Sequence, residues 1–238
     1  MVSISGNLQH VRQRIDRACA AAGRDRQAVT LLAVSKTFGA EAVRAAHAAG
    51  QRAFGENYVQ EALEKIDALA DLRPPVEWHL IGPLQSNKTR VVAERFDWVH
   101  SIDRLRIAER LAAQRPLGLP PLQLCLQVNI SGEASKSGLA PGEVAALAAA
   151  VAALPPARVR LRGLMAIPEP DPDATRQREP HRALRELLDE LRARGLALDT
   201  LSMGMSADLE AAVLEGATLL RIGTAIFGAR PTHSPTAT

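Results

Sequence analysis

Residues 29–36 read Val-Thr-Leu-Leu-Ala-Val-Ser-Lys, and this stretch decides the fold. The run from Val29 to Ser35 is almost continuously apolar, partly β-branched and of strand length. Such a run is typical of a strand that is covered on both faces, as in a parallel sheet. An amphipathic helix that Gly23 ends is predicted upstream, from apolar residues at spacings of three and four: Ile4, Leu8, Val11, Ile15, Ala18 and Ala22.

Strand-like and helix-like segments alternate along the rest of the chain. Further strands are predicted at residues 53–54, 76–81, 98–101, 122–130, 159–167, 200–201 and 218–222. Helices are predicted at residues 41–50, 59–72, 88–95, 105–114, 141–154, around 184–191, and at 207–215. Strict alternation of short apolar strands with helices implies a parallel sheet.

Eight such units fit an α/β fold of one kind, a single (β/α)8 TIM barrel with an additional N-terminal helix. An open, doubly wound sheet is the alternative, but no Gly-x-Gly-x-x-Gly turn follows the first strand. We expect one domain over residues 1–230, followed by a flexible C-terminal tail over residues 231–238, which are polar and rich in proline and threonine.

Composition narrows the function classes. The net charge is +3, and arginines alternate with acids instead of clustering, while aromatic residues make up only 3% of the chain. A nucleic-acid-binding surface would cluster the basic residues and interleave aromatics. No signal peptide is visible, and the longest nearly apolar stretch, residues 144–154, is too short to span a bilayer. We therefore expect a cytoplasmic protein without nucleic-acid or membrane partners, and a monomer, since no exposed apolar stripe demands a dimer.

The two cysteines, Cys19 and Cys125, fall in segments predicted to be buried. A metal site would need more ligands at close spacing. We expect both cysteines to serve as small apolar core residues, with neither a disulfide nor a metal between them.

Lys36 is the first candidate for chemistry. The chain has only four lysines, and Lys65, Lys88 and Lys136 fall in polar stretches, whereas Lys36 ends an apolar strand. Active sites of parallel barrels are built at the carboxyl ends of the strands. Partial desolvation there lowers the pKa of an ammonium and frees the amine to attack a carbonyl. A lysine that snorkels from a strand end is the alternative.

Two small-residue turns form the second candidate, at residues 201–208 (Leu-Ser-Met-Gly-Met-Ser-Ala-Asp) and 220–225 (Leu-Arg-Ile-Gly-Thr-Ala). Glycines let a backbone approach a ligand closely, and barrels bind phosphate with the loops after strands seven and eight. Ser202 and Thr224 add hydroxyl donors. A cap on the following helix, with Asp208 near its positive end, is the alternative interpretation of Ser206 taken alone.

Closing the barrel places the first strand beside the eighth, so Lys36 neighbours the turn that carries Arg221. An amine beside a phosphate cradle suits a cofactor that bears both an aldehyde and a phosphate. Arg221 is either an ion-pair partner at the barrel rim or a donor to a pyridine nitrogen. Because a guanidinium keeps its proton, such a donor would leave that nitrogen unprotonated and make the ring a weaker electron sink.

With these residues assembled, the chain resembles the pyridoxal phosphate homeostasis protein family over nearly its full length. The stretches that carry the resemblance are residues 33–37, 54–61, 78–88, 128–131, 135–138, 163–168, 202–206 and 221–230, and they occur in the family's order.

The resemblance implies a barrel like the N-terminal domain of alanine racemase, with pyridoxal 5′-phosphate (PLP) held as a Schiff base on Lys36. It implies phosphate contacts from Ser202, Gly223 and Thr224, with backbone help from Gly204, Met205 and Ser206. It also implies that Arg221 faces the pyridine nitrogen and that Asn57 lies near the ring. Members of this family bind the cofactor without an established turnover, and are thought to buffer it or deliver it to PLP-dependent apoenzymes.

Two other functions share parts of this site. An amino-acid racemase needs bases on both faces of the substrate α-carbon. In alanine racemases the second base is a tyrosine from another domain of a partner subunit, and this chain has a single tyrosine, Tyr58, and stops after the barrel. A Schiff-base aldolase for a phosphorylated sugar would use the amine and the cradle, but would leave Arg221 without a specific role. We expect a regulatory protein that influences amino-acid and keto-acid balance, and no catalytic residue is assigned.

Residues around the expected mouth have more than one interpretation. His79 lies mid-strand, where a core histidine is at least as expected as a ligand contact. Glu56 and Asn57 follow the second strand, which favours a role in the site. Residues 85–88 are either a helix cap or part of the rim, and Lys136 in its serine-rich loop is more typical of a solvated side chain.

Overall fold

In the computed structural model, which describes residues 3–72, 74–132 and 137–229, eight parallel strands form a closed barrel in sequence order. The strands are β1 (Thr30–Val34), β2 (Ala53–Glu56), β3 (Glu77–Leu80), β4 (Trp98–Ile102), β5 (Leu122–Gln127), β6 (Val159–Met165), β7 (Thr200–Ser202) and β8 (Leu219–Ile222). Strand β1 pairs with both β2 and β8, which closes the sheet. The expected (β/α)8 barrel is confirmed, and the open sheet is excluded.

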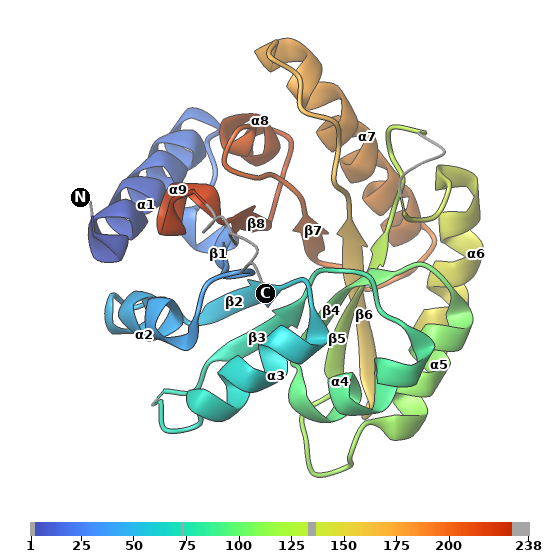
Figure 1. Ribbon diagram of the computed structural model, residues 1–238. Coiled ribbons are helices and arrows are strands. Elements are labelled where there is room, and N and C mark those ends of the chain that lie inside the picture. Colours follow the sequence, from blue (N-terminus) through green and yellow to red (C-terminus); the bar gives the residue numbers. More distant parts are fainter. Residues whose placement is uncertain (1–2, 73, 133–136, 230–238) are drawn as a thin grey trace, which may run out of the picture.

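Helices surround the barrel (Figure 1). Within the described residues they are α1 (Ile4–Ala21), α2 (Ala40–Ala48), α3 (Val59–Ala68), α4 (Thr89–Arg95), α5 (Leu105–Gln114), α6 (Pro141–Ala152), α7 (Ala174–Ala193), α8 (Leu209–Leu214) and α9 (Thr224–Phe227), with short 3-10 helices η1 (Arg26–Ala28) and η2 (Ser86–Lys88). The extra N-terminal helix α1 is present as predicted and lies beside α8 and α9 (Figure 1). None of these helices, in the part of the chain that is described, is both long and apolar enough to cross a bilayer.

The core has two layers because side chains alternate along each strand. Leu31, Ala33 and the other outward residues pack against the helices in one large apolar cluster. Leu32, Ala53 and Leu219 point the other way and form a small separate cluster inside the barrel, with Ile81 against it. The interior also holds buried polar side chains, among them His79 and His100.

Both cysteines are free and buried, as predicted. Burial raises the pKa of Cys125 to about 12, so its thiol stays protonated at neutral pH. The expected tail over residues 231–238, and Lys136, lie outside the described residues.

Candidate functional site

Lys36 lies two residues after the end of β1, half-buried at the carboxyl end of the barrel. The next residue, Thr37, has a φ of 68°, and among the described residues no other non-glycine residue has a positive φ. A β-branched residue in this region costs on the order of 1–3 kcal/mol. The Thr37 amide donates to Glu61 Oε1 at 2.6 Å, which helps to hold the chain in this sharp turn. The lysine is therefore presented by a fixed, strained backbone.

A buried ionic cluster supports this turn. The Lys65 ammonium donates to the Ser35 carbonyl at 2.7 Å, to Glu56 Oε1 at 2.8 Å and to Glu61 Oε1 at 2.6 Å. The Ser35 hydroxyl also donates to Glu56 Oε1, at 2.6 Å. Lys65 is only 4% exposed, so its place in a polar stretch of sequence does not make it a solvated lysine. Burial raises the pKa of Glu56, although the contacts with Lys65 and Ser35 oppose that rise.

The turn after β7 is compact. Gly204 has a φ of 91°, and a Cβ there would lie 2.5 Å from Ala212 Cβ and 2.7 Å from Leu220 Cδ2. The Met205 amide donates to Asp208 Oδ1 at 2.6 Å. Asp208 Oδ2 lies 2.9 Å from Nε2 of the buried His181. Position 204 requires glycine because any side chain there would overlap Ala212 of α8 and Leu220 of β8.

Ser206 is not the helix cap that the sequence left as an alternative. Helix α8 begins at Leu209 with Asp208 as its N-cap, two residues after the predicted start at 207. The Ser206 carbonyl instead accepts from both terminal nitrogens of Arg14, each at 3.2 Å, so α1 is tied to this turn.

The turn after β8 adjoins the lysine. In the pairing of β1 with β8, Leu32 is opposite Arg221 and Ala33 is opposite Ile222. A Cβ on Gly223 would lie 3.1 Å from the carbonyl oxygen of Val34, two residues before Lys36. Thr224 is exposed and begins α9. The predicted neighbourhood of the first and eighth strands is confirmed, and it brings the end of β1 to the last turn.

Arg221 lies inside the barrel and makes no ion pair with any residue in the described part of the chain. Its Nη1 donates to Ser202 Oγ at 2.8 Å, and its Nη2 donates to the carbonyl of Ala166 at 2.8 Å. Burial lowers the pKa of Arg221 to about 10, so the guanidinium remains charged at neutral pH. The Ser202 hydroxyl is fully buried and also lies 2.8 Å from Nδ1 of His100. Sequence reasoning placed Ser202 at the phosphate, and the structure places its hydroxyl against Arg221.

Asn57 lines a cavity of about 240 Å³ at the carboxyl end of the barrel, together with Ile81, Gln127 and Ile167. The Asn57 backbone packs closely on Gly82, because a Cβ built on Gly82 would lie 2.2 Å from the Asn57 carbonyl oxygen. Asn57 therefore occupies the same end of the barrel as Lys36, as predicted, although its place relative to a cofactor ring stays a prediction. Residues 86–88 form the helix η2 beside this mouth.

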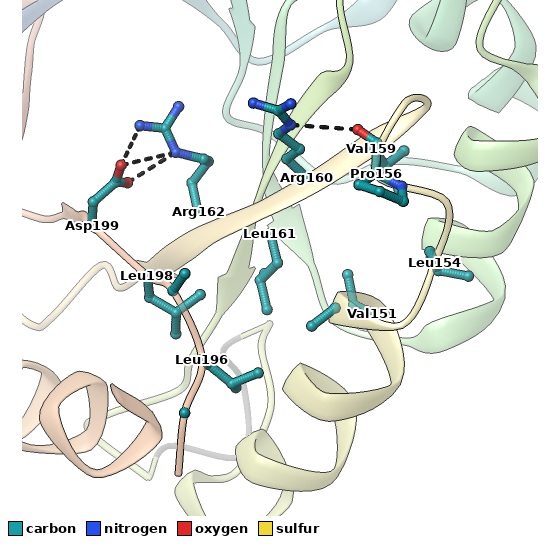
Figure 2. A pocket seen from close by; sticks show the side chains of 13 residues that line it. Val151, Leu154, Pro156, Val159, Arg160, Leu161, Arg162, Leu196, Leu198 and Asp199 are labelled. Carbon is teal, nitrogen blue, oxygen red and sulfur yellow. Dashed lines mark hydrogen bonds and ion pairs between the residues drawn. The ribbon is translucent and has the colours of Figure 1, made fainter. Parts of the chain in front are cut away.

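A larger cavity, of about 620 Å³, lies at the other end of the barrel (Figure 2). It is lined by the start of β6 at Val159 and by Leu198 and Asp199, which directly precede β7. Figure 2 shows apolar side chains such as Leu154 and Leu196 along its wall and the Arg162–Asp199 ion pair at its edge. Since the amino ends of the strands meet there, this cavity lies away from Lys36.

Sequence reasoning missed the buried contacts of Lys65, Asp208 and His100. All three side chains are buried, and each has at least one partner on another element. One signal was present for Lys65, because Glu61 precedes it by four residues and such pairs meet on a helix. No local pattern marks His100, whose partner Ser202 is 102 residues away.

Comparison with known proteins places this geometry in a class. The sequence pattern of the family "Alanine racemase, N-terminal domain" matches residues 6–231. The pyridoxal phosphate homeostasis protein of Pseudomonas aeruginosa is 63% identical over 235 residues, which cover 99% of both chains. That of Escherichia coli is 56% identical over 231 residues, covering 97% of this chain and 98% of the other. The solved structure of PipY from Synechococcus elongatus with PLP bound is 41% identical, with a TM-score of 0.76 over 90% of this chain and 99% of that one.

The fold is thus the α/β barrel of the alanine racemase N-terminal type. Within that class, the chain belongs to the pyridoxal phosphate homeostasis protein family. The resemblance seen in the sequence motifs is confirmed.

Proposed function

We propose that this protein binds pyridoxal 5′-phosphate as a Schiff base on Lys36 and serves in intracellular PLP homeostasis, without robust catalytic turnover. The observation that carries the proposal is the close approach of Gly223 to Val34, which sets the lysine beside the turn after β8. Homologues bear the homeostasis name, and PipY is described with PLP bound.

The residues present fit the cofactor. An amine is needed for its aldehyde and a cradle for its phosphate, and the two glycine turns supply close-packed backbone where a Cβ at Gly204 would overlap its neighbours. We assign the phosphate to the backbone around Gly204–Ser206 and to Gly223 and Thr224. The Met205 amide already donates to Asp208, and the Ser202 hydroxyl already contacts Arg221, so phosphate contacts from these two groups stay predictions.

Arg221 is assigned to the pyridine nitrogen. When bound, the cofactor supplies an electrophilic aldehyde and a ring that accepts electrons. Lys36 would hold the cofactor through its side-chain amine, and a linkage that water can reverse would suit storage and delivery. A charged arginine at the ring donates a hydrogen bond without giving up its proton, and this weakens the ring as an electron sink. Recipient PLP-dependent apoenzymes, a cytoplasmic location and a monomeric state belong to the same proposal.

An amino-acid racemase is the second candidate, because the fold is shared with alanine racemase. Racemisation requires a second base opposite Lys36. Tyr58, the single tyrosine, is 59% exposed at the start of α3. An exposed phenol is poorly placed to work in a water-excluded site, which favours the regulatory function.

The test is the visible spectrum of the purified protein loaded with PLP, followed by borohydride reduction and peptide mapping. We expect a yellow protein and label on Lys36 alone. Lys36→Ala should abolish the band, whereas Lys88→Ala, at an exposed lysine near the same end of the barrel, should keep it. Labelling of another lysine, or a colourless wild type, would refute the site. Proton exchange at the α-carbon of L-alanine and other amino acids, with formation of D-isomers, would establish the racemase instead.

A further inference from the structure

Five side chains form an unbroken line of hydrogen bonds through the interior of the barrel. It starts at Glu77, whose Oε1 lies 2.6 Å from His79 Nε2. Nδ1 of His79 lies 2.9 Å from Nε2 of His100, and Nδ1 of His100 lies 2.8 Å from Ser202 Oγ. The line ends where Arg221 Nη1 donates to Ser202 Oγ at 2.8 Å. It therefore joins the amino end of β3 to the arginine assigned to the cofactor.

The strand alternation that builds the barrel turns these residues inward. Leu80, Val99 and Leu220 point outward into the helix layer, so their neighbours His79, His100 and Arg221 point into the barrel. His79, His100 and Ser202 are fully buried. A buried polar group without a partner is costly, and within the described residues both ring nitrogens of each histidine have a partner in this line.

With both imidazole rings neutral, the two ends of the line fix the direction of every hydrogen bond in it, because a neutral ring that donates from one nitrogen accepts at the other. Arg221 can only donate, and an ionised Glu77 can only accept. Ser202 therefore accepts from Arg221 and gives its own proton to His100 Nδ1. His100 then carries its proton on Nε2 and donates to His79, which in turn donates from Nε2 to Glu77. Burial lowers the pKa of His100 well below its ordinary value, in keeping with a neutral ring.

Aromatic packing holds the lower part of the line in place. The His79 ring stacks on Trp98 with centroids 5.3 Å apart and planes 5° apart. The Arg162 guanidinium lies 5.1 Å from the centre of the Trp98 ring. Arg162 also pairs with Asp199, and this ion pair is seen in Figure 2. These contacts restrict rotation of the imidazole, so the polarity of the line is maintained up to Ser202.

We propose that His79 and His100 are positioning residues for Arg221: the oriented line Glu77–His79–His100–Ser202 holds the guanidinium in the geometry in which it meets the pyridine nitrogen. The histidines do not touch the cofactor and act through Ser202. The role in cofactor geometry rests on the proposed function, whereas the direction of the line does not.

The first experiment needs no cofactor. Long-range ¹H–¹⁵N correlation spectra of histidine-labelled protein report which ring nitrogen bears the proton. We expect His79 and His100 to be neutral and protonated on Nε2. Ser202→Ala should shift the His100 Nδ1 signal and leave those of His47, on α2, unchanged. A charged His100, or one protonated on Nδ1, would overturn the assignment of the line.

The second experiment reads the loaded protein. His100→Leu removes both hydrogen bonds, while His100→Gln keeps one acceptor and one donor on an amide. We expect His100→Leu to shift the visible absorption maximum and to weaken PLP retention about tenfold, the effect of one lost buried hydrogen bond. His100→Gln should restore both towards wild type, and Ser202→Ala should show the same shift as His100→Leu.

The outcomes separate cleanly. If wild type shows no visible band, the proposed function fails while the protonation pattern of the histidines still tests the line. If the band is present and His100→Leu, folded by circular dichroism, matches wild type in spectrum and retention, the positioning role is wrong. Should His100→Leu fail to fold, Ser202→Ala alone decides, and an unchanged spectrum in that variant overturns the proposal.

Discussion

Lys65 is a buried side chain with several hydrogen bonds close to the proposed site. Its ammonium has three acceptors, two of them carboxylates, and it is almost completely buried. Desolvation makes such a cluster costly to assemble, but removal of one partner leaves the others as uncompensated buried charges. Lys65 is therefore a structural residue whose loss acts on the turn that presents Lys36.

We expect Lys65→Met to lower the free energy of unfolding by about 3–5 kcal/mol, as for other broken buried ion pairs. Urea denaturation at neutral pH measures this. Arg44→Ala removes a comparably short pair with Asp71 that is partly exposed, and should cost less than about 1 kcal/mol. Equal losses in the two variants would contradict the burial argument.

Gly204 is the glycine at which a side chain has least room in the proposed phosphate cradle. We expect Gly204→Ala to weaken PLP retention at least about tenfold and to destabilise the fold, because a Cβ overlaps Ala212 and the φ is positive. Fluorescence or absorbance titration with PLP measures retention. Gly142→Ala, in the first turn of α6 with open space around it, is the matched control and should bind PLP normally.

Residues that follow strand ends could be predicted from the sequence, whereas residues buried between elements could not. Lys36, Arg221 and the two glycine turns are marked by position, since strand ends meet at one rim in any parallel barrel. The partners of His100 and Lys65 depend on which side chains face each other in three dimensions. A single sequence does not contain that information in local form.

Among the elements, α1 contacts the proposed phosphate turn after β7 through Arg14. Arg14 binds Glu210 of α8 through two nitrogens, at 2.8 and 2.9 Å, and the carbonyl of Ser206. Glu210 follows the turn that we assign to the phosphate. The extra helix thus holds the cradle from outside the barrel.

We expect Arg14→Ala to weaken PLP retention several-fold with a smaller effect on stability, because the side chain is about one-third exposed. Equilibrium binding and thermal unfolding of the same preparation separate the two effects. Arg17→Ala, on an exposed part of the same helix, should change neither. A loss of stability without any loss of PLP retention would show that Arg14 contributes only to the packing of α1.

Element boundaries show where sequence patterns mislead. The fifth and sixth strands were predicted to run to residues 130 and 167, but β5 ends at Gln127 and β6 at Met165. Apolar residues continue beyond both strands because Val128, Ile130 and Ile167 line or support the mouth of the barrel. Apolar character extends past the hydrogen-bonded part of a strand when the loop itself is part of a cavity wall.

One buried carboxylate, that of Glu215, connects α7 to the end of α8. Glu215 is 1% exposed and accepts from Arg178, Arg182 and Arg185. Burial alone would raise the pKa of Glu215, but the hydrogen bonds from Arg178 and Arg182 outweigh it and hold that pKa below its ordinary value. A carboxyl with a depressed folded-state pKa stabilises the protein above its unfolded pKa, and that stability is lost as the pH falls through the folded value.

We expect wild-type stability to fall as the pH drops below about 5, where an unfolded glutamate begins to take up its proton. Glu215→Gln should be less stable at pH 7 and should show a smaller further loss between pH 7 and pH 3.5, measured by urea unfolding at each pH. Glu109→Gln, on the exposed face of α5, is the control. If wild type and Glu215→Gln lose the same stability between pH 7 and pH 3.5, Glu215 does not contribute to the pH dependence.

The pairing of β1 with β8 has a consequence for how the protein is made. A ribosome releases position 36 long before position 224, so the nascent chain carries the proposed cofactor lysine without the turn after β8 to which we assign the phosphate. Only after the last strand has emerged from the exit tunnel can the ring close around both groups. At the proposed site, capture of PLP is thereby delayed until synthesis is nearly finished, and a chain that stalls earlier would hold none.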